Sequence, residues 1–455
     1  MNSFDPSLGS GGPASEASSV RYLHLIILVF VLNVISGVLF MHFVNRPVYD
    51  DQYNIYDVHA YAAKGPTAAA IRAQRNPPGP AAFLWMAAAV RLLGGEELLD
   101  ARIATLLSWV LLVVGLLVGA RYSNAPQLWR GALLASLVFP HSVTATATVL
   151  TEGPALLFAV LGAITWVECT SRPVVTPALL VCEMLGGLSL GVSVTCRQYY
   201  LALLPAAALW ALFQFRRRAP GERSLWAAGA LLSLALAAVP VLLLVIVWKG
   251  ISSPGMATGT SYNMFWKAGI GFNFIRPVVA AFSTAFYLLP LTSPVILRVK
   301  FAHAWRAISA AALGGVVIAY FRSWFLQPGP LRTLIHASSR VPGGEFAFTW
   351  FIAGLTIYAA IALSVRLLGE KALLLSCPPV AFAFLTVVFF ILEQIGVGGN
   401  LPLYDRYFLQ VAPFLGILAF SLFPRLTYGR LLTIAASSLV SHVMLWRYAF
   451  GMQTF

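Results

Sequence analysis

Residues 22–44 read YLHLIILVFVLNVISGVLFMHFV, an apolar run without Asp, Glu, Lys or Arg. A helix needs about 20 apolar residues to cross the hydrocarbon core of a bilayer. The run is too long for the apolar part of a signal peptide, and no A-x-A-like cleavage site follows it, so we expect it to stay as a first transmembrane helix. Residues 1–20 are polar and rich in Ser, Gly and Pro, which predicts a disordered cytoplasmic tail.

Similar runs fill the rest of the chain. Of the 455 residues 59% are hydrophobic and 10% are charged, and a soluble domain of this size does not have such a composition. The predicted fold class is therefore all-α: a polytopic membrane protein of about 12–14 transmembrane helices, forming a single domain over 21–455. The predicted spans are 22–44, 102–120, 131–149, 153–168, 176–195, 199–215, 225–248, 275–297, 307–320, 347–365, 372–392, 407–423 and 431–447.

The basic residues indicate how the chain is oriented. The formal net charge is +14, but the positive side chains recur at alternate span ends instead of forming one stripe. This positive-inside pattern makes the N-terminus cytoplasmic, places the loop 45–101 outside and argues against a nucleic-acid partner. The short loops and Ala-rich helices are typical of a prokaryotic protein, so we expect a bacterial inner-membrane protein. The residues on the cytoplasmic side are Arg216, Arg217, Arg218, Arg223, Arg298, Lys300, Arg306, Arg425 and Arg430.

The first external loop, 45–101, has a pattern of its own. Apolar and polar residues alternate over 53–62 at a spacing that suits a helix lying on the membrane surface. Gly65-Pro66 would end that helix, and the Asn-Pro-Pro-Gly sequence at 76–79 opens a second apolar stretch, 80–94, which is short for a span. We therefore expect two interfacial helices separated by a Pro-rich turn.

Asp50 and Asp51 stand at the start of this loop. A single acid there would be read as a solvated loop end, but two adjacent carboxylates cannot both ionise freely, so the pKa of one tends to rise. A carboxylate so placed can accept a proton from an alcohol or hold a metal ion. Asp57, further along the same helix, is expected to be solvated.

Two arginines lie on the same external side. Arg197 ends one predicted span and the next begins almost at once, so its charge either reaches the headgroups or binds a ligand phosphate, for which a guanidinium is well shaped. Arg406 follows Asp405, with which it could pair, and Tyr404 and Tyr407 flank it. These aromatic residues could form an ordinary interfacial belt or line a groove for a lipid or a sugar.

Further titratable residues complete the set. Glu152 lies at a tight external turn between two predicted spans, where it could reach the same cavity. Glu183 is in the middle of a span and is either functional or a protonated packing residue. His336 lies in an external loop, and its role is open. The cysteines have neither metal nor disulfide spacing and are expected to pack in the membrane: Cys169, Cys182, Cys196 and Cys377.

The sequence contains no Walker motif, no GxGxxG after a strand, no HExxH and no nucleophile elbow. Nucleotide-driven chemistry of that kind is therefore unsupported. The candidate residues share one external leaflet, whereas a nucleotide sugar would be cytoplasmic. An external glycosyl-transferring enzyme would have to take a lipid-linked donor.

Three ordered motifs carry a family resemblance. The region from Asp51 to Gly79 has the spacing of an Asp-Glu motif followed by Tyr-x-x-Gly and Thr-Pro-Pro-Gly. Residues 191–198 match a Gly-Val-Ser…Arg-Gln motif, and residues 402–413 match Pro-Leu-x-x-x-Arg-Tyr-x-x-x-x-Pro with a small offset. The chain resembles the GT-C superfamily of polyprenyl-phosphate-sugar-dependent glycosyltransferases, and within it most the Die2-like α-1,2-glucosyltransferases, which add the last glucose to the dolichol-linked N-glycan precursor. Gln52 stands where that family has glutamate, so the acidic pair has moved to Asp50 and Asp51.

The resemblance implies an inverting transfer of a hexose, most simply glucose, from a polyprenyl-phosphate sugar to a lipid-linked or cell-envelope glycan on the periplasmic face. Asp51 would be the catalytic base with Asp50 supporting it, and Arg197 and Arg406 would bind the donor phosphate. A divalent metal, Mg²⁺ or Mn²⁺, on the acidic pair occurs in some relatives and is not required here. Further expected substrate contacts are Gln198, Tyr53, Glu152, Tyr407 and His336.

Two other classes stay open. A flippase or transporter of lipid-linked sugars would also be polytopic and basic, but it would be expected to show paired halves or charges at mid-membrane. An O-antigen ligase would carry its signature in one large late external loop, whereas the first loop dominates this chain.

Overall fold

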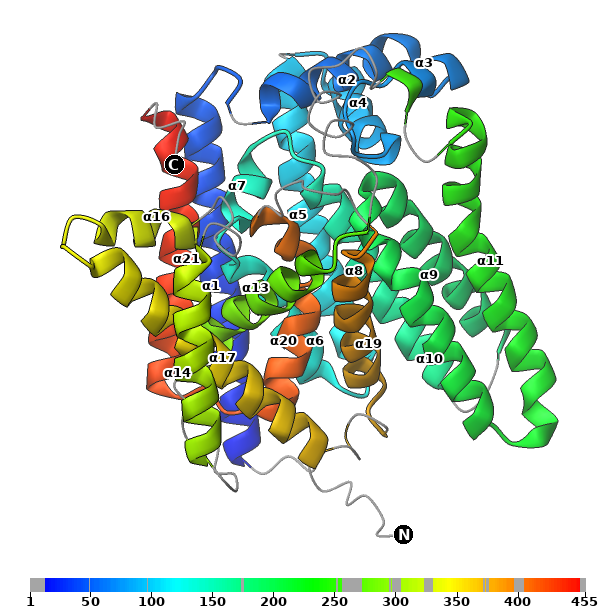
Figure 1. Ribbon diagram of the computed structural model, residues 1–455. Coiled ribbons are helices and arrows are strands. Elements are labelled where there is room, and N and C mark those ends of the chain that lie inside the picture. Colours follow the sequence, from blue (N-terminus) through cyan, green and yellow to red (C-terminus); the bar gives the residue numbers. More distant parts are fainter. Residues whose placement is uncertain are drawn as a thin grey trace.

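The computed structural model describes residues 13–48, 50–95, 97–172, 176–250, 253–255, 272–293, 296, 304–322, 330–370, 373, 376–396 and 405–450. Within these residues, the only regular secondary structure is helical (Figure 1). The elements are α1 (Pro13–Phe43), α2 (Asp51–Lys64), α3 (Ala68–Ala73), α4 (Pro80–Leu93), α5 (Glu97–Tyr122), α6 (Pro126–Val138), α7 (Ser142–Ala147), α8 (Glu152–Ser171), α9 (Pro177–Cys196), η2 (Gln198–Ala202), α10 (Leu203–Arg217), η3 (Pro220–Glu222), α11 (Arg223–Trp248), α13 (Ile275–Thr292), α14 (Ala304–Tyr320), α16 (Pro330–Ser338), α17 (Gly344–Gly369), α19 (Pro378–Glu393), η6 (Asp405–Gln410), α20 (Ala412–Leu422) and α21 (Tyr428–Ala449).

Seven helices in the described part of the chain are long and apolar enough to cross a membrane, and the all-α fold class is confirmed. They are α1, α5, α8, α9, α11 with the turn before it, α13 and α17. Four more helices, namely α4, α14, α19 and α20, are apolar but shorter. The thirteen predicted spans therefore exceed the seven that meet these criteria, because several of them form shorter or broken helices. The chain is a multi-pass membrane protein.

Proline breaks one of the predicted spans. The apolar run 131–149 divides into α6 and the short helix α7, with Phe139 in an extended conformation (φ −63°, ψ 139°) between them. Pro140 explains the break, because proline has no N–H to donate and disfavours a helical conformation in the residue before it. The chain then turns again, so that residues 148–151 lie between α7 and α8.

The described part of the loop 45–101 forms a layer at one end of the molecule. Figure 1 shows α2, α3 and α4 together at the top, while the α10–α11 connection lies at the opposite end. The predicted ends are confirmed: α2 is followed by Gly65 at φ 70°, and Gly79 precedes α4, whose first residue is Pro80. The structure adds the short helix α3 between the two expected helices.

The N-terminal tail differs in one respect from the prediction. Residues 13–20 belong to α1, although they were expected to be disordered with the rest of 1–20. Ala and Glu in this stretch are good helix formers, so the apolar helix extends beyond its apolar part. Residues 1–12 lie outside the described residues.

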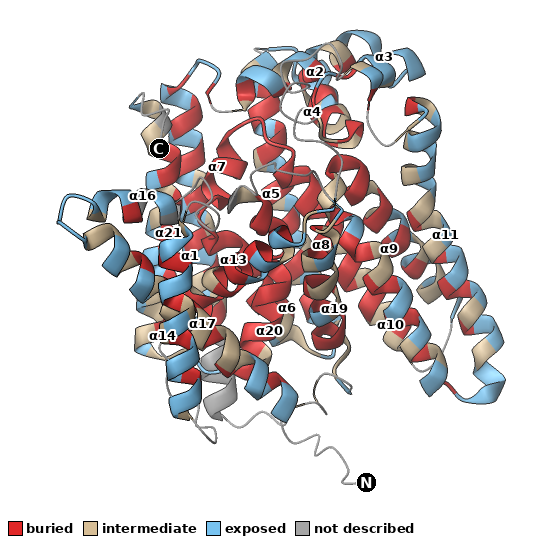
Figure 2. Cartoon of the chain, viewed as in Figure 1, coloured by how far each residue is buried: buried red, intermediate tan, exposed pale blue. Residues whose placement is uncertain are grey.

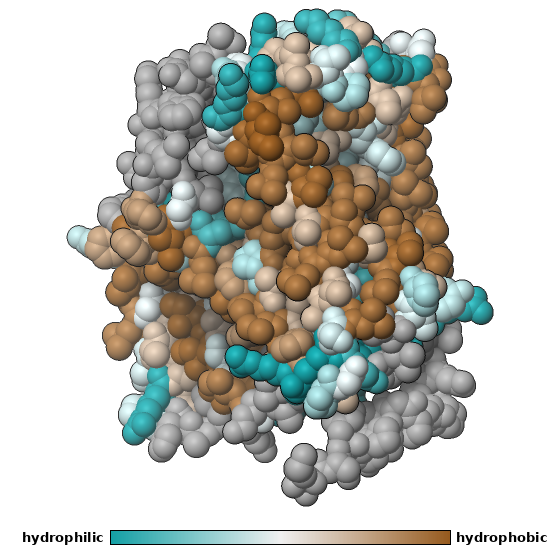
Figure 3. Space-filling view, turned by 90° about the vertical axis from the view of Figure 1, so that its right-hand side faces the viewer, coloured by the Kyte–Doolittle hydropathy of each residue, from teal (hydrophilic) through white to brown (hydrophobic). Residues whose placement is uncertain are grey.

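Burial separates the core helices from the outer ones (Figure 2). All six residues of α7 are buried, and 72% of the apolar window of α8 is buried, against 22% for α11 and for α17. Figure 3 shows a face on which hydrophobic residues form a broad band between hydrophilic residues at the two ends. The outer helices therefore offer the apolar surface that lipid requires.

Candidate functional site

Asp51, in the loop 45–101, is an enclosed acid. Its carboxylate has an exposed fraction of 0% and forms an ion pair with Arg102, whose side chain is 1% exposed, at 2.5 Å between Nη2 and Oδ2. The backbone N–H of Val149 donates to Oδ1 at 2.5 Å, and that of Val48 donates to Oδ2 at 3.3 Å. Protein donors thus occupy both carboxylate oxygens.

The Asp51–Arg102 pair connects three segments of the chain. Besides Asp51, the Arg102 guanidinium donates to the carbonyls of Val44, at 2.5 Å, and Arg46, at 2.9 Å. Burial raises the pKa of the Asp51 carboxyl, and the adjacent Arg102 charge with its hydrogen bonds opposes that shift. The pair therefore ties the start of α2, the end of α1 and α5 together.

Asp50 belongs to a different group of charges. Its side chain is 29% exposed, and Oδ2 accepts a hydrogen bond from Nη1 of Arg406. Nε of Arg406 lies 3.7 Å from Oε1 of Glu152, and Nη2 of Arg197 lies 3.3 Å from the same oxygen. These four residues form one network, which we call the ion network: Asp50, Glu152, Arg197 and Arg406.

Two tyrosine rings border the ion network. The ring centroids of Tyr199 and Tyr407 are 4.6 Å apart. The Arg197 guanidinium carbon lies 4.9 Å from the Tyr407 centroid, and that of Arg406 lies 5.4 Å from it. Arg197 also donates to Oγ1 of Thr151 at 2.8 Å. Both guanidinium groups are therefore held in place by aromatic and polar neighbours.

Helix ends place each member of the ion network. Asp50 immediately precedes α2, and Glu152 is the first residue of α8, so the positive ends of two helix dipoles face these acids. Arg197 follows α9 in an extended conformation (φ −154°, ψ 119°), and Arg406 lies in η6. The site forms where four segments end, begin or turn.

The carboxylate of Glu152 has unused hydrogen-bond acceptors. Its side chain is 6% exposed, and neither carboxylate oxygen has a hydrogen-bond partner among the described residues, although two guanidinium groups lie nearby. Buried polar atoms are normally hydrogen-bonded. The ion network is thus a place where a further polar group, such as a sugar hydroxyl, could be bound.

Asp57 corrects a prediction. It was expected to be solvated but is buried, and its carboxylate accepts hydrogen bonds from the backbone N–H groups of Arg75 and Asn76, both at 3.0 Å, and from Nδ2 of Asn76 at 2.6 Å. Burial raises the pKa of Asp57, and these hydrogen bonds oppose the shift. The sequence pattern gave no sign that the Pro-rich turn would fold back over this residue.

The remaining predicted substrate contacts are placed as follows. Tyr407 borders the ion network, as described above. Gln198 donates from Nε2 to the carbonyl of Pro77 at 2.6 Å, and the exposed side chain of Tyr53 lies on α2, one turn from Asp50. His336 is exposed on α16, which packs on α17, and the structure does not bring it into the ion network. Tyr404 and the side chain of Asp405 lie outside the described residues.

Sequence reasoning missed three residues in and around the site: Arg102, which pairs with Asp51, and Thr151 and Tyr199, which contact Arg197. Arg102 could have been suspected, because it is a charge at the start of a predicted span and such a residue needs a partner. No pattern in the sequence singled out Thr151 or Tyr199. Glu183, by contrast, is buried in α9 away from the network's helix ends, with Oε1 unpaired among the described residues.

The acidic pair does not fit a shared metal site. Asp50 faces Arg406, whereas both oxygens of Asp51 are bonded to Arg102 and backbone N–H groups. Two carboxylates directed at separate guanidinium groups do not offer the converging oxygen ligands that Mg²⁺ or Mn²⁺ requires. Among the described residues no group of three His, Cys, Asp or Glu side chains could hold a metal ion.

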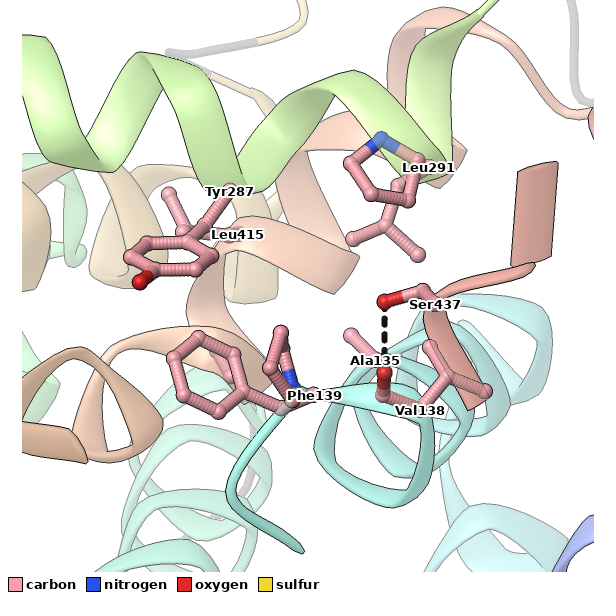
Figure 4. Close-up of a pocket in the computed structure, with 10 residues that line it drawn as sticks. Ala135, Val138, Phe139, Tyr287, Leu291, Leu415 and Ser437 are labelled. Atoms are coloured by element: carbon pink, nitrogen blue, oxygen red, sulfur yellow. Dashed lines mark hydrogen bonds between the residues drawn. The ribbon is translucent and has the colours of Figure 1, made fainter. Parts of the chain in front are cut away.

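An apolar crevice lies elsewhere, among α6, α13, α20 and α21 (Figure 4). In it, the ring centroids of Phe139 and Tyr287 are 4.7 Å apart, and Ser437 donates to the Val138 carbonyl at 2.7 Å. No member of the ion network lines this crevice. The candidate site is therefore the ion network.

Comparison with solved structures finds weak similarity to several proteins. ArnT from Cupriavidus metallidurans bound to undecaprenyl phosphate has 14% identity over 95% of this chain and 78% of its own, with a TM-score of 0.42. The Archaeoglobus fulgidus oligosaccharyltransferase has 14% identity over 81% and 53%, with a TM-score of 0.37. Arabinosyltransferase EmbB from Mycobacterium smegmatis has 15% identity over 99% and 42%, with a TM-score of 0.37.

These structural similarities are low, and they do not single out the Die2-like family. No protein-family model matches the chain, and no curated protein matches it in sequence.

Proposed function

We propose that the protein is a membrane glycosyltransferase. It transfers a hexose, most simply glucose, from a polyprenyl-phosphate sugar to a lipid-linked or cell-envelope glycan on the external face of the membrane. The observation that carries this proposal is the ion network, in which a partly exposed carboxylate, Asp50, pairs with Arg406, and Glu152 lies between Arg406 and Arg197. The ordered motifs that resemble the GT-C superfamily support the same reaction.

The two arginines have the chemistry of a phosphate site. A guanidinium binds phosphate oxygens with two parallel hydrogen bonds. The guanidinium groups of Arg197 and Arg406 lie 3.3 and 3.7 Å from the same oxygen, Oε1 of Glu152, without a hydrogen bond to it, so a donor phosphate could replace that carboxylate as their common counter-ion. Held there, they would stabilise the negative charge that grows on the leaving phosphate, a contribution typically worth several kcal/mol.

The burial of Asp51 supports an exchange of the two aspartate roles predicted from the sequence. A general base must come within hydrogen-bond reach of the hydroxyl whose proton it takes. Asp51 is fully enclosed and bonded at both oxygens, whereas Asp50 is partly exposed. We therefore assign the base to Asp50 and a positioning role to Asp51.

The reaction then runs in one displacement. The acceptor hydroxyl oxygen attacks C1 of the donor sugar and forms the new glycosidic bond, while the C1–O bond to the lipid phosphate breaks with inversion. The hydroxyl proton passes to Asp50, and the polyprenyl phosphate leaves on Arg197 and Arg406. No metal ion is needed to balance these steps.

A transfer assay tests the proposal. The purified protein would be given a panel of polyprenyl-phosphate sugars and acceptor lipids extracted from its native membrane, and the product would be followed by mass spectrometry. We expect the acceptor to gain one hexose, and Arg406→Ala to raise the KM for the donor by about 10- to 100-fold, the effect of losing a charged hydrogen bond. Movement of the donor across vesicles without any transfer would instead identify a flippase.

A further inference from the structure

The Asn-Pro-Pro-Gly turn at 76–79 connects the two halves of the site, and neither the reaction nor the ion network yet uses it. One half is α2, which Asp50 precedes. The other is the end of α9, which Arg197 follows. The turn lies against both.

The contact with α9 depends on glycine. A Cβ added at Gly79 would lie 1.9 Å from the carbonyl oxygen of Thr195 and 2.6 Å from its carbonyl carbon. Real Cβ atoms do not approach backbone this closely, so any side chain at position 79 would push the turn away from α9. Gln198, three residues after Thr195, donates from Nε2 to the Pro77 carbonyl at 2.6 Å. The turn is thus held against the helix end that leads into Arg197.

The contact with α2 is a buried polar network. The Asp57 carboxylate accepts three hydrogen bonds from Arg75 and Asn76, and Nδ2 of Asn76 also donates to the Tyr53 carbonyl at 2.8 Å. The Gln74 side chain donates to the Asn76 carbonyl at 2.8 Å and to that of Pro78. Tyr61 donates to Gln74 Oε1 at 2.8 Å. Because these groups are buried, loosening one leaves others without partners.

We propose that Gly79 and Gln198 are positioning residues, which fix the separation between the Asp50 carboxylate and the Arg197 guanidinium by clamping the turn 76–79 onto the end of α9. The inference rests on the proposed function, because it assigns the acceptor side to Asp50 and the donor side to Arg197. It also replaces the substrate contact predicted for Gln198. In a one-step displacement the attacking oxygen and the leaving phosphate lie on opposite sides of C1, so this separation governs the rate.

Gly187 offers a matched control. A Cβ there would lie 2.2 Å from the Ser233 carbonyl oxygen, the same kind of backbone clash, but between α9 and α11, in the middle of α9 and not at the end that Arg197 follows. Gly79→Ala and Gly187→Ala should therefore lower thermal stability to a similar degree. Only Gly79→Ala should lower kcat per folded molecule, by about 10- to 100-fold with the KM for the donor unchanged, since a displacement of about 1 Å can cost that much.

Gln198 supplies an independent variant. Gln198→Glu keeps the length of the side chain but replaces the donor to Pro77 by an acceptor, so kcat should fall again with both KM values unchanged. A rise in the KM for either substrate at unchanged kcat would assign Gln198 to substrate contact and overturn the inference for that residue. Equal loss of kcat in Gly79→Ala and Gly187→Ala, or no loss in Gly79→Ala, would overturn it for the turn.

A distance measurement tests the inference without activity. Spin labels at Tyr56, exposed on α2, and Leu201, exposed on η2 just after Arg197, would be introduced into a cysteine-free protein. Gly79→Ala should shift or broaden the distance distribution, and Gly187→Ala should leave it as in the wild type. An unchanged distribution in Gly79→Ala overturns the positioning role. Absence of transfer by the wild type, with the distance shift present, would instead reject the proposed function.

Discussion

The two neighbouring aspartates Asp50 and Asp51 lie in opposite environments. Asp51 is fully enclosed, and Arg102 with two backbone N–H groups fills both of its oxygens. Asp50 is partly exposed and shares Arg406 with Glu152, whose own oxygens lack hydrogen-bond partners among the described residues. The enclosed pair of Asp51 and Arg102 stabilises the structure. The ion network, in which the Glu152 oxygens have no hydrogen-bond donor from the described part of the chain, can instead exchange partners with a substrate.

The largest effect on transfer should come from the partly exposed acid, Asp50. Asp50→Asn removes the base while keeping the size of the side chain, so transfer should fall by about 10²- to 10⁴-fold. The melting temperature should change little, because the side chain is partly solvated. Steady-state transfer by the purified variant measures the effect. Full activity in Asp50→Asn would return the base to Asp51.

The next largest effect is on stability and comes from the enclosed pair of Asp51 and Arg102. Asp51→Asn leaves Arg102 as a buried charge without its counter-ion, and the free energy of unfolding should fall by about 3–5 kcal/mol. Thermal unfolding in detergent ranks the variants by their stability. The double change Asp51→Leu with Arg102→Leu should regain much of the loss, because it removes both charges together.

An Asp51→Asn protein that melts like the wild type but has lost transfer would contradict this division of roles. It would indicate that Asp51 takes part in the chemistry, as the family resemblance implies.

The smallest effect is expected from an exposed hydrogen-bonded pair of side chains that joins α2 to α5. His59 and Glu97 are 2.6 Å apart, but their side chains are 62% and 47% exposed. Such pairs contribute about 0–1 kcal/mol. His59→Ala should therefore leave transfer intact and shift the melting temperature only slightly. A loss of stability comparable to that of Asp51→Asn would mean that contacts on the outer face of α2 also hold this helix in place.

The sequence predicted the all-α membrane fold and the Pro-rich turn because both depend on local patterns, namely run length, proline and glycine. It also singled out all four members of the ion network, since charges are rare in this chain and need a reason near lipid. It could not assign partners. Asp50 and Asp51 look equivalent in sequence, and only the position of Arg102 and of the segment after α7 decides which one is enclosed.

The number of spans and the state of Asp57 were harder to predict for the same reason. Whether an apolar run crosses as one helix depends on residues such as Pro140, and whether an acid is solvated depends on what folds over it. Both are tertiary effects, which a window of sequence does not contain.

The ion pair between Asp50 and Arg406 joins residues 356 positions apart. The site is therefore completed late in biosynthesis, after the helices between these residues have been made and inserted. Until η6 is in place, Asp50 and Glu152 have no Arg406 to pair with, so a chain that stops short of residue 406 should be inserted but inert. Activity thus marks chains in which η6 has reached its place.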